Sequence, residues 1–118
     1  MAVMSHPLVE GQPVMPLPAR EPAALRAAVA RLDPAALARF EADWTAATAR
    51  ARDEYSLLPA RYFVEHWFTW VAVERWPRLA ARLRACERIV AESPDRAERR
   101  VAADEISKIL QQAETAAA

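Results

Sequence analysis

Glycine and cysteine are almost missing from this sequence, which has one residue of each among 118. A single glycine, Gly11, excludes the glycine-rich loops that cradle phosphates and the glycine-flanked nucleophile of many hydrolases, because those motifs need several glycines at fixed spacing. A single cysteine, Cys86, excludes cysteine-based zinc motifs and any disulfide within the chain. We therefore expect no cofactor and no enzymatic activity.

Histidine is scarce as well, with only His6 and His66. His66 alone falls in a segment expected to be helical, so a metal site would have to collect carboxylates from other helices. Glu65 is its neighbour in sequence, and adjacent helical residues point in different directions, which prevents a simple acid and base pair. We interpret His66 as a histidine at the edge of the core.

Net charge is absent, because 16 lysines and arginines balance 16 aspartates and glutamates. No overall field therefore attracts nucleic acid or an anionic membrane. The most apolar stretch, residues 57–76, contains Arg61, Glu65, Glu74 and Arg75, whereas a membrane span needs about 20 residues nearly free of charge. With no secretory signal at the amino terminus and one unpaired cysteine, these features predict a cytoplasmic protein that does not enter a membrane.

Proline and alanine are abundant in the sequence, whereas glycine is scarce. Nine prolines occur in a chain that is 53% hydrophobic, and the β-branched runs of strands are missing. This composition predicts an all-α protein, a compact bundle of four to five helices. We expect a flexible proline-rich tail over residues 1–20, one helical domain over residues 21–114, and a frayed end over residues 115–118.

Helix start signals divide the expected domain into five segments. A proline suits the first turn of a helix, since its missing N–H has no partner there, and a preceding aspartate or serine can cap the free N–H groups. Asp33-Pro34 and Ser93-Pro94-Asp95 are two such starts. Together with the apolar spacing, they predict helices over residues 22–32, 34–55, 59–76, 78–91 and 94–114.

The helix expected over residues 59–76 has an unusually wide apolar face. At about 100° per residue its large apolar side chains cover roughly two thirds of the circumference. These residues are Tyr62, Phe63, Val64, Trp67, Phe68, Trp70, Val71 and Val73. Such a helix is either the centre of a bundle or is completed by another chain. Glu74 falls within this arc and needs a partner, for which Arg78 or Arg82 is the candidate.

Two groups of residues are candidates for contacts with other molecules. Trp76, at the end of the wide helix and off its main arc, is a candidate surface anchor for a protein partner. The last helix presents a one-sided stripe that could lie in a partner's groove, formed by Ile106, Ile109 and Leu110.

A locally basic stretch gives the candidate contacts to anions. It contains Arg75, Arg78, Arg82, Arg84 and Arg88. Because these arginines do not form a single stripe on a helix, the alternative is a solvated edge on which they pair with acids of the second helix, Asp43, Asp53 and Glu54.

Three segments carry a family resemblance. The run Leu37-x-x-Phe40-Glu41-x-x-Trp44, the link over residues 55–59 and the segment over residues 67–72 resemble a group of short actinobacterial proteins of unknown function. The resemblance spans about residues 22–91. Members of that group are often encoded beside small ribonuclease-like toxins of the RelE and ParE type, which implies an antitoxin role. No catalytic residue is implied.

The sequence thus favours a non-enzymatic protein-binding module, with a small toxin as the partner that the resemblance implies. Two alternatives stay open. One is a homodimeric structural or adaptor protein in which the wide helix is covered by its own copy. The other is a DNA-binding regulator that uses the region from Arg75 to Arg88.

Overall fold

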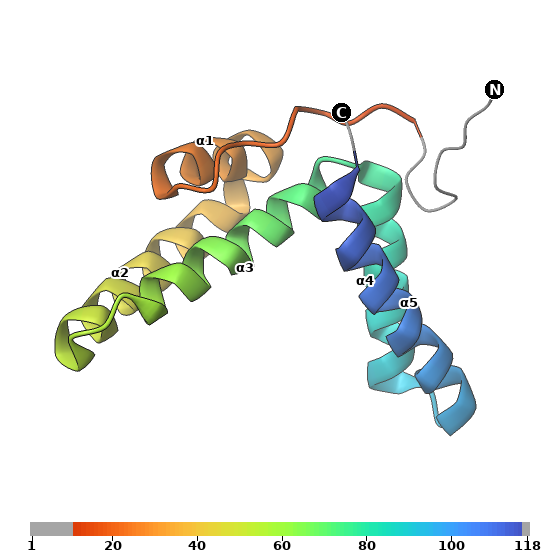
Figure 1. The fold of residues 1–118 in the computed structure, drawn as a ribbon. Helices are drawn as coiled ribbons and strands as arrows, with labels where there is room; N and C mark the ends of the chain where they lie inside the picture. Colours follow the sequence, from red (N-terminus) through yellow and green to blue (C-terminus); the bar gives the residue numbers. More distant parts are fainter. Residues whose placement is uncertain (1–10, 117–118) are drawn as a thin grey trace. The chain divides into compact units, whose positions relative to one another are not determined.

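The structure is a computed structural model that describes residues 11–116. Within this range the chain forms five α-helices and one short 3-10 helix, without strands, which confirms the all-α prediction. In order these are α1 (Pro22–Leu32), η1 (Pro34–Ala36), α2 (Leu37–Glu54), α3 (Leu58–Glu74), α4 (Pro77–Glu92) and α5 (Arg96–Thr115) (Figure 1). The first ten residues of the predicted flexible tail and the last two of the predicted frayed end lie outside the described residues.

The helices group into two compact units. One comprises Leu17–Val71 and so contains α1, η1, α2 and most of α3. The other joins the segment that ends at Pro16 to the chain from Ala72 onward, and it contains α4 and α5. The single domain expected over residues 21–114 stays a prediction.

The unit over residues 17–71 begins with two proline-started helices. Pro22 lies in the first turn of α1, and that helix ends at Leu32, both as predicted. The Asp33 side chain then accepts a hydrogen bond from the Ala35 N–H at 3.1 Å. This cap opens η1 rather than α2 itself, so the predicted helix over residues 34–55 starts with one tighter turn.

An aromatic cluster holds α2 against α3 within this unit. The Phe40 ring lies 5.0 Å from the Phe63 ring and 5.2 Å from the Trp67 ring, measured between centroids, in edge-to-face geometry. Leu25 and Val29 of α1 are fully buried, as is Trp67. Such aromatic pairs contribute about 0.5–1.5 kcal/mol each beyond the burial of their area. These ring contacts therefore join the N-terminal part of α2 to the middle of α3.

In the other unit α4 and α5 pack side by side (Figure 1). Leu79 and Cys86 of α4 and Ile109 of α5 are buried. The α5 cap is Asp95, whose carboxylate accepts from the N–H groups of the next turn, rather than Ser93 as the sequence suggested. The reason is that the Ser93 hydroxyl accepts the Asp95 N–H at 3.1 Å, which makes a turn before the helix begins.

Arg75, in the link between α3 and α4, is fully buried and ties the ends of this unit together. Its guanidinium donates to the Ala116 carbonyl at 2.8 Å and to the Met15 carbonyl at 3.3 Å. Its own carbonyl accepts the Val14 N–H at 2.7 Å. Burial lowers the pKa of the Arg75 guanidinium, because desolvation disfavours its charge.

Candidate functional site

The link between α2 and α3 begins with a tight turn at the C-terminus of α2, and an unexpected residue, Tyr55, occupies that turn. The Tyr55 N–H bonds to the Arg52 carbonyl and the Ser56 N–H to the Ala51 carbonyl, the two bonds of a Schellman motif. Tyr55 has φ 51° and ψ 44°, the left-handed conformation that such a motif requires. Glycine is the usual residue there, because a side chain in this conformation costs about 1–2 kcal/mol. The link therefore holds a tyrosine under strain.

Packing of the side chain does not offset this strain, because Tyr55 is 97% exposed. Three more large apolar residues beside it are also open to solvent: Leu57 is 75% exposed, Leu58 49% and Tyr62 67%. We call these four residues the tip patch. The two tyrosines alone expose roughly 300 Å², taking about 200 Å² for a whole tyrosine. An apolar patch of a few hundred Å² on a small protein commonly marks an interaction site.

Grooves connect the members of the tip patch into one surface. Leu57, Leu58 and Tyr62 line a groove of about 640 Å³ together with Ala60 and Val64. Tyr55 and Leu57 line a second groove of about 370 Å³ against the end of α2. Because Leu57 belongs to both grooves, the patch is continuous across the link.

A third groove carries the surface onto the side of the helix pair. Tyr62 lines it together with Phe63, His66 and Trp67, and its volume is about 360 Å³. The indole N–H of Trp67 donates to Asp43 across this groove at 3.2 Å. His66 is exposed, and its ring contacts that of the buried Trp67 at 5.4 Å between centroids.

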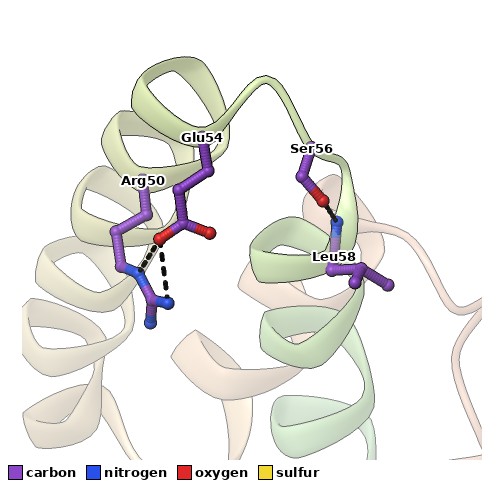
Figure 2. A network of polar contacts seen from close by, with 4 residues as sticks. All are labelled: Arg50, Glu54, Ser56 and Leu58. Atoms are coloured by element: carbon purple, nitrogen blue, oxygen red, sulfur yellow. Dashed lines mark hydrogen bonds and ion pairs between the residues drawn. The ribbon is translucent and has the colours of Figure 1, made fainter.

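Polar contacts hold the backbone of the link in place. Figure 2 shows the Ser56 hydroxyl accepting the Leu58 N–H at 3.1 Å, while Arg50 and Glu54 pair along α2. The Leu58 side chain points away from that ion pair (Figure 2). The link is thus a shaped turn with bonded backbone groups, and its apolar side chains project outward from it.

Two cations at the margins of the tip patch have no acidic partner among the described residues. Arg61 lines the larger groove and Arg52 lines the groove beside Tyr55. Arg20 also lines the larger groove, but it is paired with Glu65 at 2.5 Å and lies over the Phe68 ring. The margin of the patch therefore carries excess positive charge.

The residues predicted to contact a partner do not belong to the tip patch, and they are more buried than we expected. Trp76 is 5% exposed, so as placed it is a core residue rather than a surface anchor. Its indole N–H is buried and has no hydrogen-bond partner among residues 11–116. Ile109 is fully buried, while Ile106 and Leu110 beside it are half-buried. The α5 stripe thus packs on its own unit, and a partner role for it stays a prediction that requires α5 to leave α4.

The five arginines of the predicted anion-contact region do not act together. Arg75 is buried, and Arg84 donates to both carboxylate oxygens of Glu74 at 2.8 and 2.9 Å. Glu74 has the ion-pair partner that we predicted it needs, but Arg84 fills that role rather than Arg78 or Arg82.

The remaining three arginines lie on the exposed side of α4. Arg82 pairs with Glu105 of α5, and Arg78 and Arg88 are exposed. The pairs on Arg82 and Arg84 match the alternative of a solvated helix edge, although with Glu105 and Glu74 as the acids.

The described residues offer no metal centre, since residues 11–116 contain no group of three or more histidine, cysteine, aspartate or glutamate side chains placed to hold an ion. Burial raises the pKa of the Cys86 thiol, which keeps it protonated and poorly nucleophilic at neutral pH. None of the described helices is both long and apolar enough to cross a membrane.

A comparison with known protein families found one matching family model. The model of DUF6247, a family of unknown function, matches residues 13–114. The chain belongs to this family. Neither a curated protein nor a solved structure matched the chain.

The tip patch of this DUF6247 chain is what sequence reasoning missed. The spacing of Tyr55 continues the apolar stripe of α2, which indicates a core residue, and Tyr62 belongs to the wide apolar arc predicted for residues 59–76. The available signal was the run of residues 55–58, which puts three large apolar side chains at a helix break where polar turn residues are usual.

Proposed function

We propose that this chain is a non-enzymatic protein-binding module that recognises its partner through the tip patch. The observation that carries the proposal is Tyr55, a tyrosine that is 97% exposed in a left-handed conformation. Neither folding nor packing is served by that side chain at that position. Strain that folding does not require occurs typically at binding and catalytic positions.

The composition of the surface supports a protein as the partner. Tyrosine and arginine are enriched at the centres of protein interfaces, and lysine and glutamate are depleted there. The tip patch presents Tyr55 and Tyr62 with Leu57 and Leu58 between them. Tyrosine has only two side-chain torsions to fix, so it contributes contact area at a low cost in entropy.

The base of the tip patch is held in place before any partner arrives. Phe63, one residue after Tyr62, is buried against Trp44 and Phe40. The Schellman bonds and the Ser56 contact hold the backbone of the link. A surface that is already ordered loses little entropy on association, which favours affinity.

The identity of the partner in this proposal comes from the resemblance to short actinobacterial proteins. Because such proteins are often encoded beside small toxins, a toxin of the RelE or ParE type is the partner class that we propose, and the chain would act as its antitoxin. A cytoplasmic location is part of the proposal, since the free thiol of Cys86 is compatible with a reducing compartment.

The experiment is capture of partners from the native host with three tagged baits, compared by quantitative mass spectrometry. The first bait is the wild-type chain and the second carries Leu57→Asp, which puts a charge into the tip patch. The third is a matched control, Val101→Asp, which puts the same charge on a different exposed apolar residue. Val101 is 66% exposed.

We expect a protein in fixed stoichiometry that is retained by the first and third baits and lost from the second. Equal recovery on all three baits would refute the tip patch as the binding surface. Light scattering on the purified wild-type chain then tests the homodimer alternative, since a dimer that Leu57→Asp dissociates would make the chain's own copy the partner.

A further inference from the structure

Two of the grooves around the tip patch carry positive charge, which limits the kind of partner that they can bind. The groove beside Tyr55 is lined by one charged side chain, that of Arg52. The larger groove contains Arg61, Arg20 and Glu65, of which the last two neutralise each other. Each of these two grooves thus has an apolar floor and one uncompensated cation.

The acids of the tip do not offset this charge within the grooves. Glu54 is paired with Arg50 on α2, and neither lines these two grooves. Asp53 is exposed and also lines neither of them. A segment lying on the patch would therefore meet positive charge on both sides of Leu57.

We propose that the tip patch seats an acidic amphipathic segment of a partner protein, with apolar side chains on Tyr55, Leu57 and Tyr62 and carboxylates on Arg52 and Arg61. This inference rests on the proposed function and concerns only the segment that makes contact. Arginine binds carboxylates in a bidentate way, and opposite charges at the margin of an apolar contact guide the partner into register.

The floor of the grooves favours a peptide over a nucleic acid. Tyrosines and arginines can also stack bases and contact phosphates, so a single strand is the competing occupant. However, most of the uncharged side chains that line the larger groove are aliphatic, from Leu57, Leu58, Ala60 and Val64. Such side chains offer no hydrogen bonds to base edges and suit apolar side chains of a peptide.

The test is a selection from a displayed library of random 16-residue peptides against the full chain. A counter-selection against the Leu57→Asp variant removes peptides that bind outside the tip patch. We expect the enriched peptides to combine several large apolar residues with a net negative charge. Enrichment of neutral or basic peptides would overturn the charge inference and leave the proposed binding surface in place. No enrichment over the Leu57→Asp variant would overturn both.

Charge reversal then measures the contribution of the two arginines. Arg61→Glu and Arg52→Glu should each weaken the best acidic peptide by about tenfold or more, as expected for a charge at an interface margin. Arg100→Glu on α5 is the matched control, because it changes the net charge equally at an exposed residue, and it should leave affinity within about twofold. Equal losses in all three variants would mean that only the overall charge matters and would overturn the inference.

A labelled single-stranded oligonucleotide serves as the second probe. It should not compete with the selected peptide. Competition that depends on Leu57 would assign the tip patch to nucleic acid instead.

Discussion

Replacing Tyr55 by glycine tests the strain at the tip of the α2–α3 pair. Tyr55 has φ 51°, in the left-handed region, and its side chain is open to solvent. Removing the side chain relieves about 1–2 kcal/mol of backbone strain. The added freedom of glycine in the unfolded chain offsets about 0.4–1 kcal/mol of that gain. We therefore expect Tyr55→Gly to raise the free energy of unfolding by up to about 1 kcal/mol.

Two further variants isolate the cause. Tyr55→Ala retains the Cβ atom and with it the strain, so its stability should stay within about 0.5 kcal/mol of the wild type. Ala42→Gly, at an exposed position within the regular part of α2, should lower the free energy of unfolding by about 0.5–1 kcal/mol. Glycine thus has opposite effects at two positions of one helix region.

Urea unfolding followed by circular dichroism measures all three, and equal slopes with denaturant show that the variants are comparable. A loss of more than about 1 kcal/mol in Tyr55→Gly would contradict the strain at this residue, since it would mean that the tyrosine packs against the protein. A glycine variant that is less stable than the alanine variant would contradict a left-handed backbone at this residue, because glycine is favoured only there.

Three more predictions concern the buried groups. Trp67→Phe removes the hydrogen bond to Asp43 and part of a fully buried side chain, and should lower the free energy of unfolding by about 1–3 kcal/mol in urea; an unchanged midpoint would contradict the assigned contact. Arg75→Met leaves the buried Ala116 carbonyl without its donor and should cost about 1–3 kcal/mol in the same assay; a gain in stability would mean that desolvation of the cation outweighs its hydrogen bonds. Because burial raises the pKa of Cys86 above that of the unfolded chain, its contribution to stability is complete at neutral pH and is lost as pH rises through the folded pKa. Alkylation by iodoacetamide at pH 8 should therefore be slow until urea unfolds the protein, and rapid labelling of the native chain would refute the burial.

Much of the fold could be predicted from the sequence because its helix signals are local. Pro22 and Asp33 set the start of α1 and of η1 through their own backbone and side chain, independent of the rest of the protein. The wide arc of α3 correctly indicated a helix with buried residues on several sides, among them Trp67, Phe68 and Val73.

The candidate site could not be predicted in the same way, because exposure depends on where neighbouring helices end. Tyr55 has the helical spacing of a core residue, yet α2 ends one residue before it, at Glu54. Tyr62 belongs to the same arc as Trp67 but stays exposed. Trp76 shows the converse, since its place at a helix end suggested the surface and the α3–α4 link buries it.

The most direct test of the central claim is the recovery of partner on a Tyr55→Gly bait relative to the wild-type bait, measured by mass spectrometry from the native host. This variant removes an interface tyrosine while the fold keeps or gains stability, so a loss of partner cannot be attributed to unfolding. We expect recovery to fall by about tenfold or more, as for a residue near the centre of an interface. Recovery equal to that of the wild type would contradict the tip patch as the binding surface.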